Sequence, residues 1–600
     1  MELKFALCGL LTAMAMTAGA SQPENVVIAD AEEVYTFVGG AEFLMVKTVE
    51  KAKYEATRHS ETIYPHTYYN NKINLDKVSG GKAEYRSVND PNIFHDDDHI
   101  CVFEAELKGK GATAKSEFRR TYTDVAHFTV VPLGSVYPVR NKLVKIEIPA
   151  SCPGIDVVGM NLPAEVVVRN DMTNPNGSRT IMFTVSGMAG QNRDTGAPSA
   201  LARSPYLLIK GCFKDLAALA RFHEEKLDVD TSIPNLDQLL GEIVEDEDSK
   251  EVKISKIYKY VQQKIRYVAF EEGEAGYRPD APAEVLRKHY GDCKGMALLL
   301  ATMLKGVDIE AYVSAVGTRK IPFKIAEFPS LVATNHMICI VPADGDTLFL
   351  DATNKYIAAH DIPFGIQGKD AMLFKDGGFE MVEIPMREPD MSSDETECEY
   401  VIEDGRLSGK LVRCFKGDML EMFKYEVDQL STPYKNDVIA KGIGPRSNVK
   451  VDRESLTGRF VSDGVYELTA DFEDKNALTD TGEALYVDLN TDGEPLVSRV
   501  DLSDRKSDYE LPFRAKIARR SKLKVPDGYS VGELPENFVK DCGSAVFSCE
   551  FVKEDDGHVV MVKSAVIKYV SISLSELPGW NKAIADWNEA CNHQIELLKK

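Results

Sequence analysis

The spacing of apolar residues changes twice along this chain, and these changes limit the folds that it can adopt. From Val34 to about Phe213, short runs of alternating apolar and polar residues are separated by Gly, Pro and Asn, which is typical of antiparallel strands in a sandwich. Apolar residues then recur at helical spacing from Ile254 to Ile265. Alternating runs return after about residue 376. The pattern therefore predicts two β-rich regions on either side of a helical block.

A chain of 600 residues is longer than one hydrophobic core normally supports, so we expect several domains. The segment Ser232-Ile233-Pro234-Asn235 interrupts the pattern and marks the first domain boundary. The expected divisions are a signal peptide at residues 1–20, an N-terminal antiparallel β-sandwich-like domain at residues 21–235, a central domain at residues 236–375, and a C-terminal β-rich domain with a terminal helix at residues 376–600.

The C-terminal region has three recognisable elements. Asp404-Gly405 separates two alternating runs and predicts a tight β-hairpin. Helical spacing predicts an inserted helix at Asp418–Leu430 and a terminal helix at Leu577–Leu598.

The N-terminus resembles an export signal. Lys4 precedes an apolar run from Phe5 to Met16, and Ala18-Gly19-Ala20 provides the small residues that a signal peptidase needs before Ser21. The run is short for a membrane span, and no later segment has eighteen consecutive apolar residues. We therefore expect an exported, periplasmic or extracellular protein without a transmembrane segment. A lipoprotein anchor at Cys8 is the weaker alternative.

Composition and charge exclude one class of partner. The chain is 44% hydrophobic and 28% charged, which is ordinary for a folded protein, and its net charge is −23. Affinity for nucleic acid comes mainly from Lys and Arg that neutralise phosphates. We therefore expect no nucleic-acid partner.

Two acidic segments resemble metal sites but are better explained otherwise. In His95-Asp96-Asp97-Asp98-His99, an extended backbone would put alternate side chains on one face, yet a solvated acidic loop is the commoner explanation. The segment Asp488–Gly493 begins like a calcium loop, but Arg499 stands where the bidentate Glu should be. We expect no metal and no cofactor.

Ten of the eleven cysteines remain after removal of the predicted signal peptide, which contains Cys8. In an oxidising compartment, Cys542 could pair with Cys549, or Cys398 with Cys414 across the predicted hairpin. Buried free thiols are the equally supported alternative.

Cys293 begins a segment that suggests chemistry. In Tyr290-Gly291-Asp292-Cys293-Lys294, the chain leaves a short helix predicted at residues 282–288 and starts another that is apolar on nearly all sides, and Gly306 ends it. A helix of this kind is buried. A thiol in its first turn is close to the positive end of the helix dipole and to unpaired N–H groups, which favour thiolate and could stabilise an oxyanion.

A histidine and a carboxylate follow on a predicted hairpin. Strands at residues 337–341 and 347–350 flank Asp344-Gly345, and a two-residue loop there would place residue 338 opposite 351 and residue 336 opposite 353. His336 and Asp351 would then be diagonal neighbours on one face, about 7–8 Å apart at Cα. A shift of one residue would separate them. In this register His336 could accept the proton of Cys293 while Asp351 orients the imidazole.

These residues resemble the transglutaminase-like superfamily. The matching motifs are Tyr290-Gly291-Asp292-Cys293-Lys294, Asn335-His336 and Leu350-Asp351-Ala352-Thr353, within about residues 250–360. The resemblance implies a papain-like α+β core in which Cys293 is the nucleophile, His336 the base and Asp351 the orienting group. Gly295 departs from the polar residue that relatives often have there, and Tyr267 is a candidate oxyanion donor.

The flanking regions are similar to those of exported bacterial proteins in which such a core lies between two β-rich domains of unknown function. Pro526-Asp527-Gly528-Tyr529 and the region from Tyr569 to Leu577 resemble the C-terminal one.

The resulting hypothesis is acyl transfer on a protein, peptide or amide substrate through a cysteine thioester. Hydrolysis is favoured over cross-linking, because no pocket for a lysine donor can be recognised in the sequence. The alternatives are a catalytically inactive binding scaffold that keeps the fold and a β-rich adhesion module whose function would not need Cys293.

Overall fold

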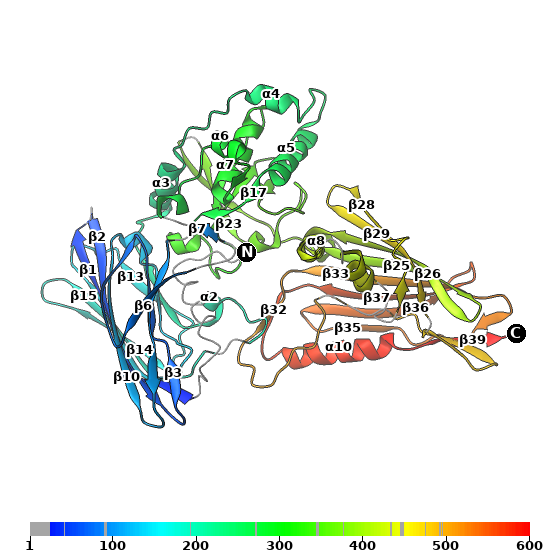
Figure 1. Ribbon diagram of the computed structural model, residues 1–600, viewed down its shortest axis with the longest axis horizontal. Helices are drawn as coiled ribbons and strands as arrows, with labels where there is room; N and C mark the ends of the chain where they lie inside the picture. The colour runs from blue at the N-terminus through cyan, green and yellow to red at the C-terminus, as the bar shows by residue number, and fades with distance from the viewer. Residues whose placement is uncertain are drawn as a thin grey trace. The chain divides into compact units, whose positions relative to one another are not determined.

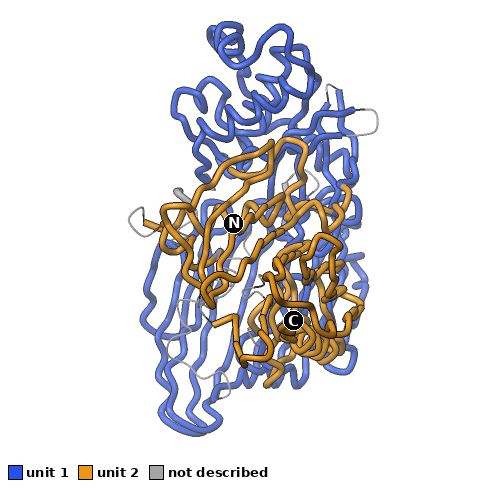
Figure 2. The backbone as a smooth tube through the Cα atoms, turned by 90° about the vertical axis from the view of Figure 1, so that its right-hand side faces the viewer, with its two compact units in different colours: residues 1–193, 199–353, 368–384 blue, residues 194–198, 354–367, 385–600 orange. Residues whose placement is uncertain are grey.

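The computed structural model describes residues 25–600 except 41–42, 89–92, 96, 192–193, 271–272, 344–346, 376, 432–434, 444–448, 475, 491–493 and 495. The predicted signal peptide lies outside the described residues. The chain is β-rich and divides into two compact units, drawn in blue and orange in Figure 2. The first unit comprises residues 1–193, 199–353 and 368–384, and the second comprises residues 194–198, 354–367 and 385–600. Among the described residues, no helix is long and apolar enough to span a bilayer.

The N-terminal part of the first unit is built on two sheets (Figure 1). A seven-stranded sheet has the order β14 (Val167–Thr173), β15 (Arg179–Met188), β12 (Val139–Ile148), β1 (Val26–Gly40), β2 (Phe43–Ala56), β10 (Thr113–Tyr122) and β5 (Ile73–Ser79). A three-stranded sheet has the order β11 (Val130–Pro132), β16 (Tyr206–Lys210) and β13 (Asp156–Met160).

One core fills the space between these two sheets. Ile146 and Phe183 of the larger sheet belong to the same buried cluster as Leu207 and Ile209 of β16. Every second residue of β12 from Val144 to Ile148 lies in this core, as the alternating pattern predicts.

The expectation that this region is antiparallel throughout was wrong at one position. β1 pairs with β12 in parallel, with Ile28 opposite Val139 and Thr36 opposite Glu147. A parallel pair needs a long crossover connection, and here β2 to β11 lie between the two strands in the sequence. Alternation of apolar residues indicates a half-buried strand but not the direction of its neighbour.

Short strands complete this region, and one of them joins it to the central part of the unit. β4 (His66–Tyr69), β8 (His99–Phe103) and β6 (Ala83–Ser87) form a small sheet, and β3 (Glu61–Ile63) pairs with β9 (Ala105–Leu107). β7 (Ile93–His95) pairs in parallel with β18 (Ala269–Phe270), which precedes the Cys293 helix in the sequence.

The central part of the first unit has helices against an antiparallel sheet. The sheet order is β22 (Leu348–Leu350), β21 (His336–Val341), β20 (Tyr312–Val316), β23 (Asp370–Lys375) and β24 (Gly378–Glu383). The helices are α3 (Leu216–Leu227), α4 (Leu236–Gly241), α5 (Lys250–Lys264), α6 (Pro282–Lys288) and α7 (Cys293–Lys305). α7 packs on β20 and β21. Thr302 and Lys305 are its two residues that are not buried, which confirms the predicted buried helix.

The second unit is dominated by a nine-stranded sheet. The main order is β27 (Lys450–Val451), β29 (Val465–Asp474), β26 (Arg406–Lys416), β25 (Ser393–Glu403), β33 (Ala515–Lys524), β37 (His558–Ile567), β36 (Ala545–Lys553) and β35 (Phe538–Asp541), and β28 (Thr457–Ser462) pairs with β29. The predicted hairpin is confirmed, because Asp404 and Gly405 join β25 to β26 with φ values of 50° and 71°. The inserted helix is α8 (Gly417–Gln429), and α9 (Lys435–Ile443) follows it.

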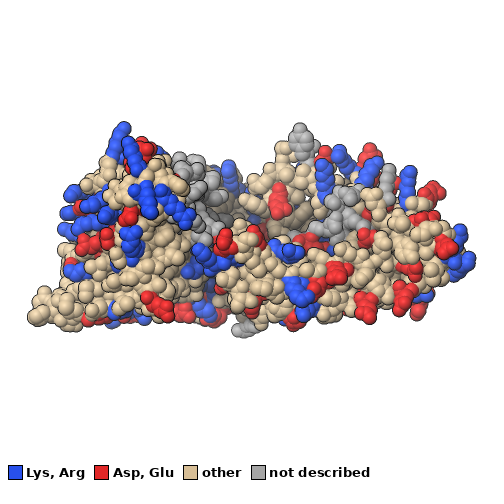
Figure 3. All heavy atoms as spheres, turned by 90° about the horizontal axis from the view of Figure 1, so that it is seen from below, with Lys and Arg blue, Asp and Glu red and all other residues tan. Residues whose placement is uncertain are grey.

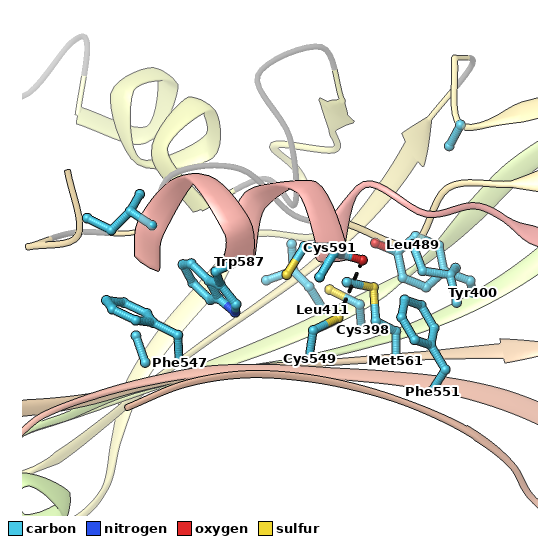
Figure 4. Packing of buried hydrophobic residues seen from close by; sticks show 14 of the residues in the cluster. Cys398, Tyr400, Leu411, Leu489, Phe547, Cys549, Phe551, Met561, Trp587 and Cys591 are labelled. Carbon is cyan, nitrogen blue, oxygen red and sulfur yellow. Dashed lines mark hydrogen bonds between the residues drawn. The ribbon is translucent and has the colours of Figure 1, made fainter. Parts of the chain in front are cut away.

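The last helix covers one face of this sheet but is shorter than predicted. α10 (Leu577–Cys591) buries Trp580 and Trp587 against Phe547, with ring centroids 5.6 and 5.3 Å apart. Figure 4 shows Trp587 and Phe547. The chain then forms β39 (Ile595–Lys599), which pairs with β31 (Ala484–Val487) and β34 (Tyr529–Val531). Ile595 and Leu597 are buried and Glu596 is not, so burial alternates here as it does in a strand. These residues lie in the range that was predicted as a helix.

All ten cysteines of the described residues are free thiols. In the β25–β26 hairpin, Cys398 is opposite Leu411 and Cys414 is opposite Glu395, so the pairing suggested by sequence spacing was wrong. The Cys542 thiol donates to the Ala545 carbonyl, 3.4 Å away. The Cys549 thiol instead lies at the end of α10, with Sγ 4.0 Å from the Ala590 carbonyl oxygen (Figure 4).

Asp394 is the centre of a buried ion cluster in the second unit. Arg413 Nε donates to Asp394 Oδ1 over 2.7 Å and Arg519 Nη2 donates to Oδ2 over 2.8 Å, while the Asp394 side chain is 0% exposed. Burial alone would raise the pKa of Asp394, but the charges of Arg519 and Arg413 lower it. This carboxylate therefore compensates two buried cations.

Replacing Asp394 by asparagine is expected to lower the free energy of unfolding by about 3–5 kcal/mol, because Arg413 loses its carboxylate partner and Arg519 keeps only Glu494, 3.5 Å away. Urea denaturation of the full chain, followed by circular dichroism, measures this change. Glu395→Gln is the matched control, since Glu395 is the next residue, is partly exposed and pairs with Lys516; its expected cost is below about 1 kcal/mol. Equal losses in the two variants would contradict this account of the cluster.

Candidate active site

The segment before Cys293 sets the start of α7. α6 ends at Lys288 and is followed by His289, whose φ of 56° is left-handed, and β19 (Tyr290–Gly291) then pairs with β17 (Arg266–Tyr267). Asp292 caps the new helix, because its Oδ1 accepts the N–H of Gly295 over 2.9 Å. Cys293 is consequently held at the first helical position, where it is 7% exposed.

Gly295, which departs from the family pattern, lies where α6 packs against α7. A Cβ added at this position would be 3.2 Å from Val285 Cγ2, closer than most real contacts. Gly291 faces the same side chain, and a Cβ added there would be 3.1 Å from Val285 Cγ1. A small residue at 295 thus allows the two helices to approach each other beside the thiol.

The hairpin that carries His336 has the register counted from the sequence. Cys339 is opposite Leu350 and Val341 is opposite Leu348, and the same register continued puts residue 336 opposite 353. The predicted turn at residues 344–346 lies outside the described residues. His336 Nε2 is 2.8 Å from Asp351 Oδ2, and both side chains are buried.

Asp351 is fixed by contacts other than His336. Its Oδ1 accepts from the Thr353 hydroxyl over 2.6 Å and from the Thr353 N–H over 3.1 Å. Its backbone carbonyl accepts from the Tyr258 hydroxyl of α5 over 2.9 Å. These hydrogen bonds hold the carboxylate so that Oδ2 faces His336, as an orienting carboxylate requires.

The charges of His336 and Asp351 favour an ion pair. Burial alone lowers the pKa of His336, but the charge and hydrogen bond of Asp351, with a smaller contribution from Cys293, raise it to about 10. Burial alone raises the pKa of Asp351, and His336 reverses this and lowers it. At neutral pH the imidazole is therefore protonated and the carboxylate ionised.

The second ring nitrogen of His336 is the one available to the thiol. Nδ1 is buried and forms no hydrogen bond of normal geometry with any described residue. Cys293 is nevertheless near enough to raise the pKa of this ring. The arrangement leaves Nδ1 for the thiol and the reacting groups, while Nε2 is bound to Asp351.

Asn335 fixes the start of the strand that carries His336, and it also lines the cavity described below. Its Oδ1 accepts the N–H of Thr318 and its Nδ2 donates to the Thr318 hydroxyl, both over 2.8 Å. Its backbone N–H donates to the Val316 carbonyl over 3.1 Å. These bonds tie the start of β21 to the end of β20, next to His336.

A cavity of about 390 Å³ lies beside the thiol, within the size range of ligand sites. Its core-side lining includes Cys293, His336 and Tyr267. The opposite lining comes from the N-terminal sheets and from α3, and sequence reasoning did not find these residues: Glu33, Tyr35, Glu50, Tyr68, Arg120, Tyr122, Lys142 and His223. In the sequence these residues follow ordinary strand or helix patterns, so no local signal marks them.

The charged residues of this lining are largely paired within the protein. Lys142 Nζ is 2.7 Å from Glu33. Arg120 pairs with Glu50, and Lys294 pairs with Asp292. On the outer surface, Lys and Arg gather over the N-terminal sheets at the left of Figure 3, with acidic side chains among them. Two partly exposed pairs of the seven-stranded sheet are Lys51 with Glu32 and Arg119 with Glu117.

The remaining sequence candidates have different outcomes. Tyr267 lies opposite Gly291 in the β17–β19 pair and lines the cavity, but its role as an oxyanion donor stays a prediction. Within the described ranges no three His, Cys, Asp or Glu residues are grouped to hold a metal ion. Of the acidic segment, the His95 side chain and Asp96 lie outside the described residues, and Asp98 accepts from Asn70 over 2.8 Å.

Comparison with known proteins identifies the central region. The family model of the transglutaminase-like superfamily matches residues 237–329, which contain Cys293. The chain carries a transglutaminase-like core. A model for a domain of unknown function, DUF3858, matches residues 490–597, so the predicted relationship of the C-terminal region is also confirmed. No curated protein matches the sequence.

One solved structure shares the multidomain fold of this chain over nearly its whole length. The crystal structure of a putative protease from Parabacteroides distasonis is 12% identical, covers 96% of this chain and 99% of that one, and superimposes with a TM-score of 0.59. An M1 zinc metallopeptidase from Deinococcus radiodurans is 8% identical and covers 41% of this chain and 55% of that one, with a TM-score of 0.19. At these identities the first likeness concerns the fold alone, and the second is too low to support an argument.

Proposed function

We propose that this protein is an exported cysteine hydrolase that cleaves peptide or amide bonds through a thioester on Cys293. The observation that carries the proposal is the His336–Asp351 ion pair, 2.8 Å between Nε2 and Oδ2, with Cys293 near enough to His336 to raise the pKa of its ring. In this papain-like arrangement the helix supplies the nucleophile and the adjacent strands supply the base and the orienting carboxylate. The predicted signal peptide would place the site in the periplasm or outside the cell.

The residues have distinct roles in the proposed reaction. Cys293 has given its proton to His336 in an ion pair that Asp351 favours, and the thiolate sulfur attacks the substrate carbonyl carbon. The N–H of Cys293 belongs to the first turn of α7, whose N–H groups have no carbonyl partner in the helix, and it is our candidate oxyanion donor, with Tyr267 as a second. Collapse of the tetrahedral intermediate breaks the C–N bond, and the leaving amine takes the proton of His336.

Deacylation reverses these roles. His336 takes a proton from a water molecule, the oxygen attacks the thioester carbon, and the C–S bond breaks to release a carboxylic acid and the thiol. Asp351 stabilises the imidazolium in both halves. An amine in place of water would give cross-linking; we favour water, and the protease description of the Parabacteroides distasonis protein agrees with that choice.

A peptide library tests this function. We expect incubation of the mature protein with proteome-derived peptides, with and without an excess of a primary alkyl amine, to produce new carboxyl termini in both reactions. Mass spectrometry distinguishes these termini from amine adducts. Adducts as the main product would mean cross-linking, and no change in any peptide would favour the binding scaffold.

A further inference from the structure

The strand β14 forms one edge of the seven-stranded sheet in the first unit. It pairs with β15 on one side, and no other described strand pairs with its second side. Six of its seven residues are exposed, and the side chains of Val168 and Met172 belong to residues that are 61% and 48% accessible. Exposed edge strands are places where sheets of separate chains can join, because their outer N–H and C=O groups have no strand partner.

The hydrogen bonds at the two ends of β14 show which of its backbone groups point outward. The N–H of Asn174 donates to the Ser178 carbonyl over 2.8 Å, and the N–H of Ser186 donates to the Val166 carbonyl over 2.9 Å. Bonded residues recur at every second position of an antiparallel pair, and the β14–β15 register has no shift. The even-numbered residues of β14 are therefore bonded to β15. The odd-numbered residues direct their N–H and C=O groups away from the sheet.

Two of these odd-numbered residues have opposite charges. Arg169 Nε and Nη2 donate to the two carboxylate oxygens of Asp171 over 2.8 and 2.7 Å, and both side chains are partly exposed. Charges on an edge strand commonly prevent pairing with other chains. Because these two charges have opposite sign and are two residues apart, their effect depends on what lies opposite them.

A second copy of β14 complements this edge. In an antiparallel pair with Asn170 opposite Asn170 of the second copy, Arg169 lies opposite Asp171 and Val168 lies opposite Met172. Odd-numbered residues then face odd-numbered ones, so Arg169 and Asp171 exchange both N–H···O bonds with their counterparts. Each positive side chain has a negative one opposite it, and the exposed apolar side chains cover each other.

Neighbouring registers are less favourable. A shift by one residue puts outward backbone groups opposite groups that are bonded to β15, so the ladder of hydrogen bonds does not form. A shift by two residues puts either Arg169 opposite Arg169 or Asp171 opposite Asp171, and like charges directly opposite each other are destabilising. The register centred on Asn170 combines hydrogen bonds with opposite charges.

We propose that β14 is a dimerisation surface, through which two copies of this chain join their seven-stranded sheets around a two-fold axis at Asn170. Such a contact is isologous, since the same strand serves both copies. The strand is short, so we expect a reversible dimer with a dissociation constant in the micromolar range. The inference depends on the edge strand alone and not on hydrolysis at Cys293.

Exchange of charges between two variants tests this pairing. Sedimentation velocity of the mature protein at about 1–100 µM should show a monomer–dimer equilibrium. Arg169→Asp and Asp171→Arg each put like charges opposite one another, so each should weaken dimerisation about tenfold or more. A mixture of the two variants has opposite charges at every charged pair and should form a heterodimer about as readily as the unmodified protein.

Glu32→Lys is the matched control for Asp171→Arg. Glu32 lies on the central strand β1 of the same sheet, is about as exposed as Asp171 and pairs with Lys51. Its substitution changes the net charge by the same amount. Because it is distant from the edge of the sheet, the dimer should persist.

A disulfide tests the register. Asn170 is opposite its own counterpart at a position without ladder hydrogen bonds, where Cα atoms are about 4.5 Å apart, and this spacing permits a disulfide. Asn170→Cys should therefore form a covalent dimer in the presence of oxidised glutathione. Val168→Cys should not, because each Val168 is four residues out of line with its own counterpart.

A monomer at all these concentrations would overturn the inference. A dimer that survives Asp171→Arg, or that is lost equally in Glu32→Lys, would overturn it as well, and so would two charge variants that do not associate when mixed. Equal cross-linking of Asn170→Cys and Val168→Cys would contradict the register centred on Asn170.

Discussion

Replacing Cys293 by alanine is expected to abolish peptide or amide hydrolysis, with a loss in kcat of roughly 10⁵-fold or more. The reason is that no other group in the described residues is placed to form the thioester. Cys293 starts a buried helix beside His336, and the other nine described cysteines do not line the cavity. The rate of formation of new carboxyl termini from library peptides measures this effect.

Cys339→Ala is the matched control for this prediction. Cys339 is fully buried on β21, three residues from His336, but it faces away from the cavity lining and its pKa is raised by burial. Its loss should cost some stability and leave hydrolysis nearly unchanged. Hydrolysis that survives Cys293→Ala, or that is lost equally in Cys339→Ala, would mean that the nucleophile has been misassigned.

Replacing Asp351 by asparagine is expected to lower hydrolysis by roughly 10²–10⁴-fold, through the protonation state and tautomer of His336. Asp351 is the main group that raises the pKa of His336, so without its charge burial dominates and this pKa falls. An asparagine amide that donates to Nε2 would also move the ring proton to Nδ1. A protonated Nδ1 cannot accept the proton of Cys293. The Thr353 contacts to Oδ1 can persist, which makes the change nearly isosteric.

The pH profile of Cys293 alkylation by iodoacetamide tests the same relation. Because His336 stays protonated up to a pKa of about 10, it can act as the counterion of the thiolate at neutral pH. His336→Ala should therefore slow alkylation at pH 6.5 by roughly tenfold or more, and the difference should shrink above pH 9, where free thiols ionise. A midpoint equal to that of a free thiol, and unchanged in His336→Ala, would contradict an activated cysteine.

The same shift has a consequence for stability. Folding raises the pKa of His336 from 6.5 to about 10, so the stabilisation by its pair with Asp351 is fully present below about pH 6.5 and is lost as the pH rises toward 10. The lowered pKa of Asp351 sets the other limit, because protonation at strongly acidic pH also removes the pair. In Asp351→Asn the decline of stability between these pH values should be smaller.

Local sequence was sufficient for the elements that carry the candidate triad. Pro282, Asp292 and Gly306 are start and stop signals, and α6 and α7 have the bounds that they predict. The spacing around residues 344–345 gave the β21–β22 register, since side chains alternate strictly along strands. These features depend on residues that are close in sequence.

Features that depend on distant residues were not predicted. The far wall of the cavity comes from strands such as β1 and β10, whose residues Tyr35 and Arg120 have the same alternating pattern as any half-buried strand. β39 was predicted as part of a helix, because Ile595 and Leu597 are compatible with both periods until the pairing with β31 is known.

Covalent labelling of the thiol is the most direct test of the account, because the proposed chemistry requires an acyl-Cys293 intermediate. The mature protein is treated at pH 7 with a panel of amide-like and ester-like electrophilic acyl probes, and the modified residue is mapped by peptide mass spectrometry, with Cys293→Ala as the control. We expect one acyl group per chain on Cys293, none in Cys293→Ala, and much slower labelling in His336→Ala. Absence of label on Cys293 with every probe, or labelling that is indifferent to His336, would contradict the assignment of a thiol acyl-transfer site.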